Sequence, residues 1–192
     1  TVPETPAPPV ASGKPIINDY FSLFKIPADL STNLVLDPVG LDSFKKGVQF
    51  LTAQPSTLKE LVLKSGDNSF IIFSQWMEVL FPGLFSSNDQ INVNALFSPR
   101  FTLFVYTDDK GSWPGFAAEL SGQDDLSYAQ GVVAKLESNP NLSNLYLTNP
   151  GSIGSWKSGN VSGVASRYLS WGLPGASLNY GWDRKLLIIS SS

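Results

Sequence analysis

The chain has 192 residues and a net charge of −3; 42% of its residues are hydrophobic and 15% are charged, and it contains 16 Gly and 14 Pro. This length and composition are typical of one loop-rich domain with its own core. Its 13 basic residues are scattered, which argues against nucleic acid as a partner. Because it has no His and no Cys, it contains no Ser-His-Asp triad, no Cys nucleophile and no His or Cys metal site, and we expect neither a metal nor a cofactor.

Residues 1–19 are rich in proline and carry no core pattern. Their opening, TVPETPAPPVASG, predicts an extended polyproline-type spacer. Such spacers hold a domain away from a membrane or from a neighbouring domain. No stretch of the sequence reaches the roughly 18 to 20 apolar residues of a spanning helix. We therefore expect this spacer to link the domain to a membrane anchor that precedes the sequence given.

Residues 20–83 are predicted to begin the folded domain with a β-α-β unit. The expected strands are 21–26, 34–36 and 58–63. Apolar residues at helical spacing predict an amphipathic helix over 41–51. The turn Ser65-Gly66-Asp67-Asn68 then closes the unit, and a second helix is expected over 70–81, with Ser69 as its cap.

Residues 84–192 are predicted to be mostly strands. The expected strands are 91–97, 101–107, 145–148, 161–171, 176–182 and 185–190, with turns at 98–100 and at Asp183-Arg184. Apolar residues repeating at three and four positions predict a short helix over 113–120, and acidic residues open another over 124–137. The Gly- and Ser-rich segment 149–163 is expected to be an irregular loop.

Together these elements predict a single α+β domain over residues 20–192. Its expected architecture is two β-α-β-type units side by side, the second ending in a C-terminal antiparallel meander, with a ferredoxin-like character. The two units correspond to possible subdomains at 20–83 and 84–192.

One motif pattern points to an enzyme. Ser43–Lys46 and Ser56–Lys59 match S-x-x-K, Ser86–Asn88 matches S-x-N, and Lys157–Gly159 matches the K-S-G element of penicillin-binding enzymes. In that chemistry a lysine deprotonates the serine nucleophile without any histidine. Against it, each element is short, Lys64-Ser65-Gly66 matches the third equally well, and Lys157 falls in the expected loop rather than on a strand. A Ser/Lys acyl transferase or hydrolase is therefore the alternative hypothesis.

Aromatic residues crowd the last third of the chain. The candidate ligand-binding residues are Trp156, Trp171, Tyr180 and Trp182. Tyr180 and Trp182 share one face of the predicted meander, and a neighbouring strand could bring Trp171 to the same face. If exposed, these rings would form a docking surface for a sugar or a protein; if buried, they belong to the core.

Two segments also carry a family resemblance. Phe101–Thr107 with Trp113–Leu120, and the closing Ala176–Ser190, resemble an uncharacterised domain of membrane-anchored proteins from candidate-phyla (patescibacterial) bacteria. The similarity spans about Thr57 to Ser190, and this chain departs from it around Trp156, where the Gly/Ser segment replaces a more charged strand. The resemblance implies a tethered, extracytoplasmic domain and supplies no catalytic residues.

The function that the sequence favours is a non-catalytic extracytoplasmic binding or assembly module of a membrane-anchored cell-envelope protein. Its partner would be a protein or another envelope component, and its contact with the membrane would run only through the anchor. A purely structural spacer domain is the third possibility.

Overall fold

An eight-stranded sheet forms the centre of the described structure. The computed structural model describes residues 20–51, 57–85, 93–122 and 126–192. In chain order the strands are β1 (Leu30–Leu36), β2 (Thr57–Ser65), β3 (Phe97–Thr107), β4 (Ser112–Leu120), β5 (Ile153–Val161), β6 (Val164–Trp171), β7 (Ser177–Asp183) and β8 (Leu186–Ser190). Their order across the sheet is β1-β2-β3-β4-β8-β7-β6-β5. This order makes β1 and β5 the two edges of the described sheet. Among these strands only β1 and β2 pair in parallel.

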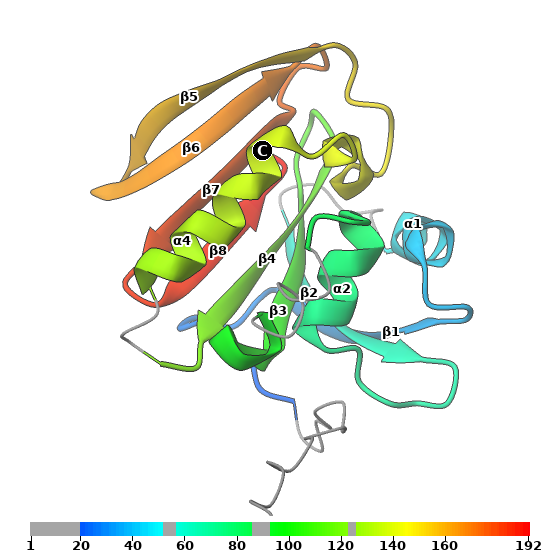
Figure 1. Cartoon of the computed structure of the whole chain (residues 1–192). Coiled ribbons are helices and arrows are strands. Elements are labelled where there is room, and N and C mark those ends of the chain that lie inside the picture. The colour runs from blue at the N-terminus through cyan, green and yellow to red at the C-terminus, as the bar shows by residue number, and fades with distance from the viewer. Residues whose placement is uncertain (1–19, 52–56, 86–92, 123–125) are drawn as a thin grey trace, which may run out of the picture.

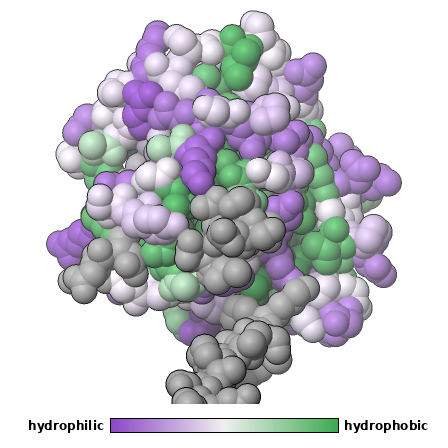
Figure 2. Space-filling view, viewed as in Figure 1, coloured by the Kyte–Doolittle hydropathy of each residue, from purple (hydrophilic) through white to green (hydrophobic). Residues whose placement is uncertain are grey.

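The helices lie together on one face of this sheet (Figure 1). They are α1 (Leu41–Gln49), α2 (Phe73–Leu80) and α4 (Leu126–Ala134), followed by the short 3-10 helices η1 (Lys135–Ser138) and η2 (Leu142–Leu145). Helix α1 connects the parallel strands β1 and β2, as expected of a crossover. Hydrophobic side chains reach the helix-bearing surface in separate patches between hydrophilic ones (Figure 2).

The larger of two hydrophobic cores among the described residues lies between the helices and the sheet. Phe44 of α1, Trp76 of α2, Val132 of α4 and Leu103 of β3 are all buried in it. The strands contribute every second residue, so that Leu61, Leu103, Phe116 and Ile189 stand side by side on four neighbouring strands. Residues of both predicted subdomains contribute to this core and to the sheet.

The opposite face of the sheet is crossed by the first described residues. The Tyr20 hydroxyl donates a hydrogen bond to Glu60 Oε1 at 2.5 Å, and the Leu23 backbone N–H donates to Thr102 Oγ1 at 2.8 Å. The Phe24 ring lies 5.6 Å from the Phe104 ring. These contacts bury Glu60 and Thr102, and their hydrogen bonds satisfy the two polar side chains. The strand predicted over 21–26 is wrong, because the described residues there pack as irregular chain.

The predicted α+β class is confirmed, and the sheet is mostly antiparallel. Strands β5 to β8 pair consecutively and antiparallel, which matches the predicted C-terminal meander. The ferredoxin-like arrangement of two β-α-β units is not confirmed: β1 pairs directly with β2, and β3 joins β4 without a helix between them.

The largest correction concerns residues 112–120, which form β4 instead of a helix. Seven of the nine residues of this strand are buried. The helices cover the face that carries Phe116, and on the other face Trp113 packs with Tyr146 and Ala176. A strand buried on both faces loses its alternating pattern. In such a continuous apolar run, some hydrophobic residues also lie three and four positions apart, which is the spacing of an amphipathic helix.

Other boundaries were also wrong. Residues 93–96 are helical and β3 runs on from Phe97 through the predicted turn at 98–100, while positions 91 and 92 lie outside the described residues. The segment 149–163 contains strand β5 rather than an irregular loop, and 145–148 forms no strand. The final hairpin turn is Arg184-Lys185, one position later than predicted, with Arg184 at φ 57°.

Candidate functional site

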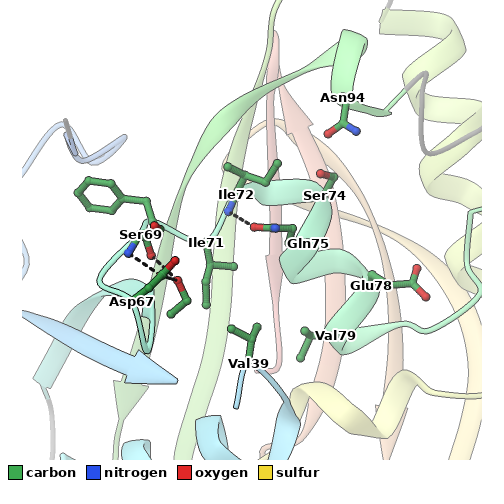
Figure 3. Close-up of a pocket in the computed structure, with 12 residues that line it drawn as sticks. Val39, Asp67, Ser69, Ile71, Ile72, Ser74, Gln75, Glu78, Val79 and Asn94 are labelled. Atoms are coloured by element: carbon green, nitrogen blue, oxygen red, sulfur yellow. Dashed lines mark hydrogen bonds between the residues drawn. The ribbon is translucent and has the colours of Figure 1, made fainter. Parts of the chain in front are cut away.

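A groove of about 530 Å³ lies where the carboxyl ends of the parallel strands β1 and β2 meet helix α2. Ligands of α/β proteins commonly bind at the carboxyl ends of parallel strands, and this volume is within the range of ligand sites. Four parts of the chain form it: Val39 after β1, the turn between β2 and α2, one side of α2, and Asn94 just before β3 (Figure 3). Its lining residues are Val39, Ser65, Asp67, Ser69, Phe70, Ile71, Ile72, Ser74, Gln75, Glu78, Val79 and Asn94.

The groove has an apolar floor. Val39, Ile71 and Val79 point toward one another in Figure 3. Ile71 is buried, whereas 41% of Val39 is exposed. The side chain of Val39 therefore offers hydrophobic surface to an occupant of the groove.

Helix α2 holds one wall of the groove in place. Gln75 Oε1 accepts a hydrogen bond from the Ile72 backbone N–H at 3.1 Å, which caps the start of the helix. On its inner side, Phe73 and Trp76 are buried and pack on Phe97, Phe101 and Phe44. The wall is therefore anchored by aromatic packing on the side that faces away from the groove.

The rim of the groove is polar and acidic. Asp67 Oδ1 accepts hydrogen bonds from the Ser65 hydroxyl at 2.5 Å and from the Ser69 backbone N–H at 3.1 Å. These bonds, with the Ser65 bond as the largest cause, lower the pKa of Asp67 below its ordinary value, so this carboxylate is charged at neutral pH. Glu78 supplies a second carboxylate, and among the described residues that line the groove there is no Lys or Arg.

The four predicted aromatic residues do not share one exposed surface. Trp156 of β5 packs edge-on against Tyr180 of β7, with ring centroids 5.6 Å apart. Trp171 packs against Tyr146 at 5.5 Å, and Trp182 stacks on Phe97 at 6.0 Å. All three tryptophans are partly buried at the border of the core. Ligand binding by these four residues stays a prediction, and their contacts give each a packing role.

Glu137 ties three strands to the helical layer. Its carboxylate accepts hydrogen bonds from Arg167 Nε at 2.8 Å, from Arg167 Nη2 at 2.7 Å and from the Tyr180 hydroxyl at 2.6 Å. Its backbone carbonyl accepts a bond from Trp156 Nε1 at 3.1 Å. The bidentate bond from Arg167 is the main cause that lowers the pKa of Glu137, and burial together with this carboxylate raises the pKa of Tyr180. The network fastens η1 to β5, β6 and β7.

Replacing Glu137 by glutamine is expected to lower the free energy of unfolding at pH 7 by about 1 to 2 kcal/mol, because the side chain is partly exposed. The pKa of Glu137 is lower in the folded than in the unfolded chain. Its stabilisation is therefore present above the ordinary pKa of 4.5 and is lost as the pH falls through the folded value. Urea unfolding at pH 7 and at about pH 3 should show the gap between wild type and E137Q shrinking. An equal gap at both pH values would contradict this assignment.

Of the serine and lysine motifs that the structure describes, Ser43 and Lys157 lie at opposite ends of the strand order, whereas Lys64-Ser65-Gly66 ends β2 beside β1. The Ser43 hydroxyl on α1 donates to the backbone carbonyls of Pro38 and Gly40, at 2.6 and 2.9 Å. Helix α1 directly follows β1, which is one edge strand of the sheet. Lys157 lies on β5, the strand at the opposite edge. Lys59 donates to Thr57 Oγ1 at 2.8 Å. Ser56 and the Ser86–Asn88 element lie outside the described residues.

Sequence reasoning missed the groove. The signal that was available was the turn Ser65-Gly66-Asp67-Asn68, which we interpreted only as the end of a β-α-β unit. Within the described ranges no cluster of three or more acidic, His or Cys side chains is arranged to hold a metal ion. Asp108 Oδ1 instead accepts bonds from the Trp113 indole and from two backbone N–H groups of its own turn.

Comparisons of the chain with protein-family models, with curated proteins and with solved structures found no match. Among the described residues, none of the helices combines the length and the hydrophobicity that a membrane crossing requires.

Proposed function

We propose that this domain is a non-catalytic binding module whose ligand site is the groove between α2 and the carboxyl ends of β1 and β2. The observation that supports this most is the groove itself: about 530 Å³, with an apolar floor, a polar rim and a wall anchored by buried aromatic rings. A rigid wall reduces the entropy that a ligand site loses on binding.

The mixture of groups in the groove suits a polypeptide ligand. The hydroxyl groups of Ser69 and Ser74 and the amide of Asn94 stand around the apolar floor. Hydroxyl and amide groups can donate to and accept from peptide groups, while the floor takes an apolar side chain. A protein partner is therefore the ligand class that we propose.

The test is a selection of random peptides displayed on phage against the whole domain. Peptides that bind in the groove should lose binding to the V39W variant, because the indole fills the floor. They should keep binding to the V161W variant, in which the same change is made at an exposed valine on β5, at the far edge of the sheet from β1. A selection that yields no peptide, or only peptides that bind V39W as well as wild type, would contradict the groove as the ligand site.

We further propose that the module works outside the cytoplasm, held to the cell envelope by its Pro-rich leader. The leader composition and the family resemblance support this. The chain has no Cys, so the D109C variant would carry a single thiol at an exposed turn. In intact cells that produce the full-length protein, a membrane-impermeant maleimide should label the D109C variant more strongly than the protein without this substitution. Labelling that appears only after lysis would overturn the proposed location.

A further inference from the structure

We propose that the groove selects a peptide segment in which a lysine or arginine lies next to an apolar side chain; this inference rests on the proposed binding function. The apolar floor of Val39, Ile71 and Val79 would take the apolar side chain. The acidic rim would take the cation. The two parts of the site lie within one groove, so they favour both features in a single short segment.

Among the described residues, more carboxylates than bases stand around the groove. Asp67 and Glu78 both line it. A third carboxylate, that of Asp37 at the end of β1, lies so close to the turn that a Cβ on Gly66 would be 2.9 Å from Asp37 Cγ. Asp37 and Asp67 are both exposed. One base also stands next to the groove, because the Lys64 ammonium lies 5.0 Å from the centre of the ring of Phe70, a lining residue. The three carboxylates outnumber it.

Asp67 has capacity for a further partner. Its Oδ1 already accepts two hydrogen bonds, from Ser65 and Ser69, which fix the orientation of the carboxylate. Within the described ranges we find no hydrogen bond to its Oδ2. A carboxylate held in this way can accept a charge-assisted bond from an ammonium or guanidinium without first losing its own side-chain freedom.

Two fluorescein-labelled octapeptides test the inference by anisotropy against the whole domain. One alternates leucine with lysine, and the other has glutamate in place of each lysine. We expect the lysine peptide to bind at least about fivefold more tightly, with a difference that decreases as salt is added. The D67N variant keeps an acceptor oxygen for Ser65 and Ser69 but removes the charge, so it should weaken binding of the lysine peptide by about threefold.

The matched control is D109N, which removes an exposed carboxylate from the turn between β3 and β4. The pairing of Thr57 with Thr107 places that turn beyond the start of β2, whereas the groove lies at its end. D109N should therefore leave the affinity unchanged, and V39W should weaken binding.

The outcomes separate the two proposals. Equal binding of both peptides, with V39W weakening both, would overturn the charge selection and leave the binding function standing. An effect of D109N as large as that of D67N would also overturn it, because the attraction would then come from overall charge. Peptide binding unaffected by V39W, together with a failed phage selection, would overturn the groove as a binding site.

Discussion

The F73A variant is expected to lose about 3 to 5 kcal/mol of unfolding free energy, the range for removing a fully buried phenylalanine. Phe73 is 2% exposed, and its ring lies 4.7 Å from Phe97, 6.1 Å from Phe101 and 6.0 Å from Phe116. Removing this ring leaves a cavity between α2 and two strands of the sheet. Urea unfolding followed by tryptophan fluorescence would measure the loss.

The matched control for this prediction is F50A, because Phe50 carries the same ring with 86% of it exposed at the end of α1. Its removal should change the unfolding free energy by less than about 0.5 kcal/mol. The F73L variant fills part of the cavity, so its free energy of unfolding should fall by less than that of F73A. Equal effects of F73A and F50A would contradict the packing of α2 described above. Because α2 forms one wall of the groove, F73A should also weaken peptide binding, whereas F50A should not.

Elements with one buried face could be predicted from the sequence, and elements with two similar faces could not. In α1, Phe44 and Val48 lie four residues apart and are buried, while Asp42 and Lys46 are exposed, so the helical period was visible. Strand β4 has apolar residues on both faces and therefore shows no period of two. Its identity depends on its neighbours β3 and β8, which are distant in the sequence.

Strand β5 was missed for the opposite reason. Its residues Gly154, Ser155, Ser158, Gly159 and Asn160 have low strand propensity and indicate a loop. Within the described sheet, β5 pairs with β6 alone, and its exposed edge buries little apolar surface. What fixes it is the pairing with β6 together with the contact of Trp156 with Glu137 and Tyr180. These are tertiary contacts that no local pattern contains.

The site illustrates the same limit. Trp156, Trp171 and Trp182 are near one another in sequence, yet the fold gives each a separate aromatic partner. The groove instead combines Val39, Asp67 and Asn94, which come from three distant parts of the chain. The sequence allowed us to recognise the turn at Asp67, but the position of Val39 opposite α2 depends on the parallel pairing of β1 with β2.

The second large effect is expected from G115A. It should lower the free energy of unfolding by about 2 to 3 kcal/mol, near the upper part of the range for overpacking a core. Gly115 lies on β4 between Phe104 of β3 and Ser190 of β8. A Cβ at this position would meet the Phe104 ring and would lie 2.7 Å from the Ile189 carbonyl oxygen. The control is G131A on α4, where a Cβ would meet nothing within 4 Å. That change should stabilise the helix by about 0.5 to 1 kcal/mol.

A double-mutant cycle with F104A shows which of the two contacts dominates the cost of G115A. The Phe104 ring can rotate away, because its end is the far part of a side chain. The Ile189 carbonyl cannot move without shifting β8, whose backbone is held by β4 on one side and β7 on the other. We therefore expect that adding G115A to the F104A variant still lowers the free energy of unfolding by more than half of the loss that G115A causes in the wild type. Complete rescue by F104A would mean that the ring, and not the backbone of β8, requires glycine at position 115.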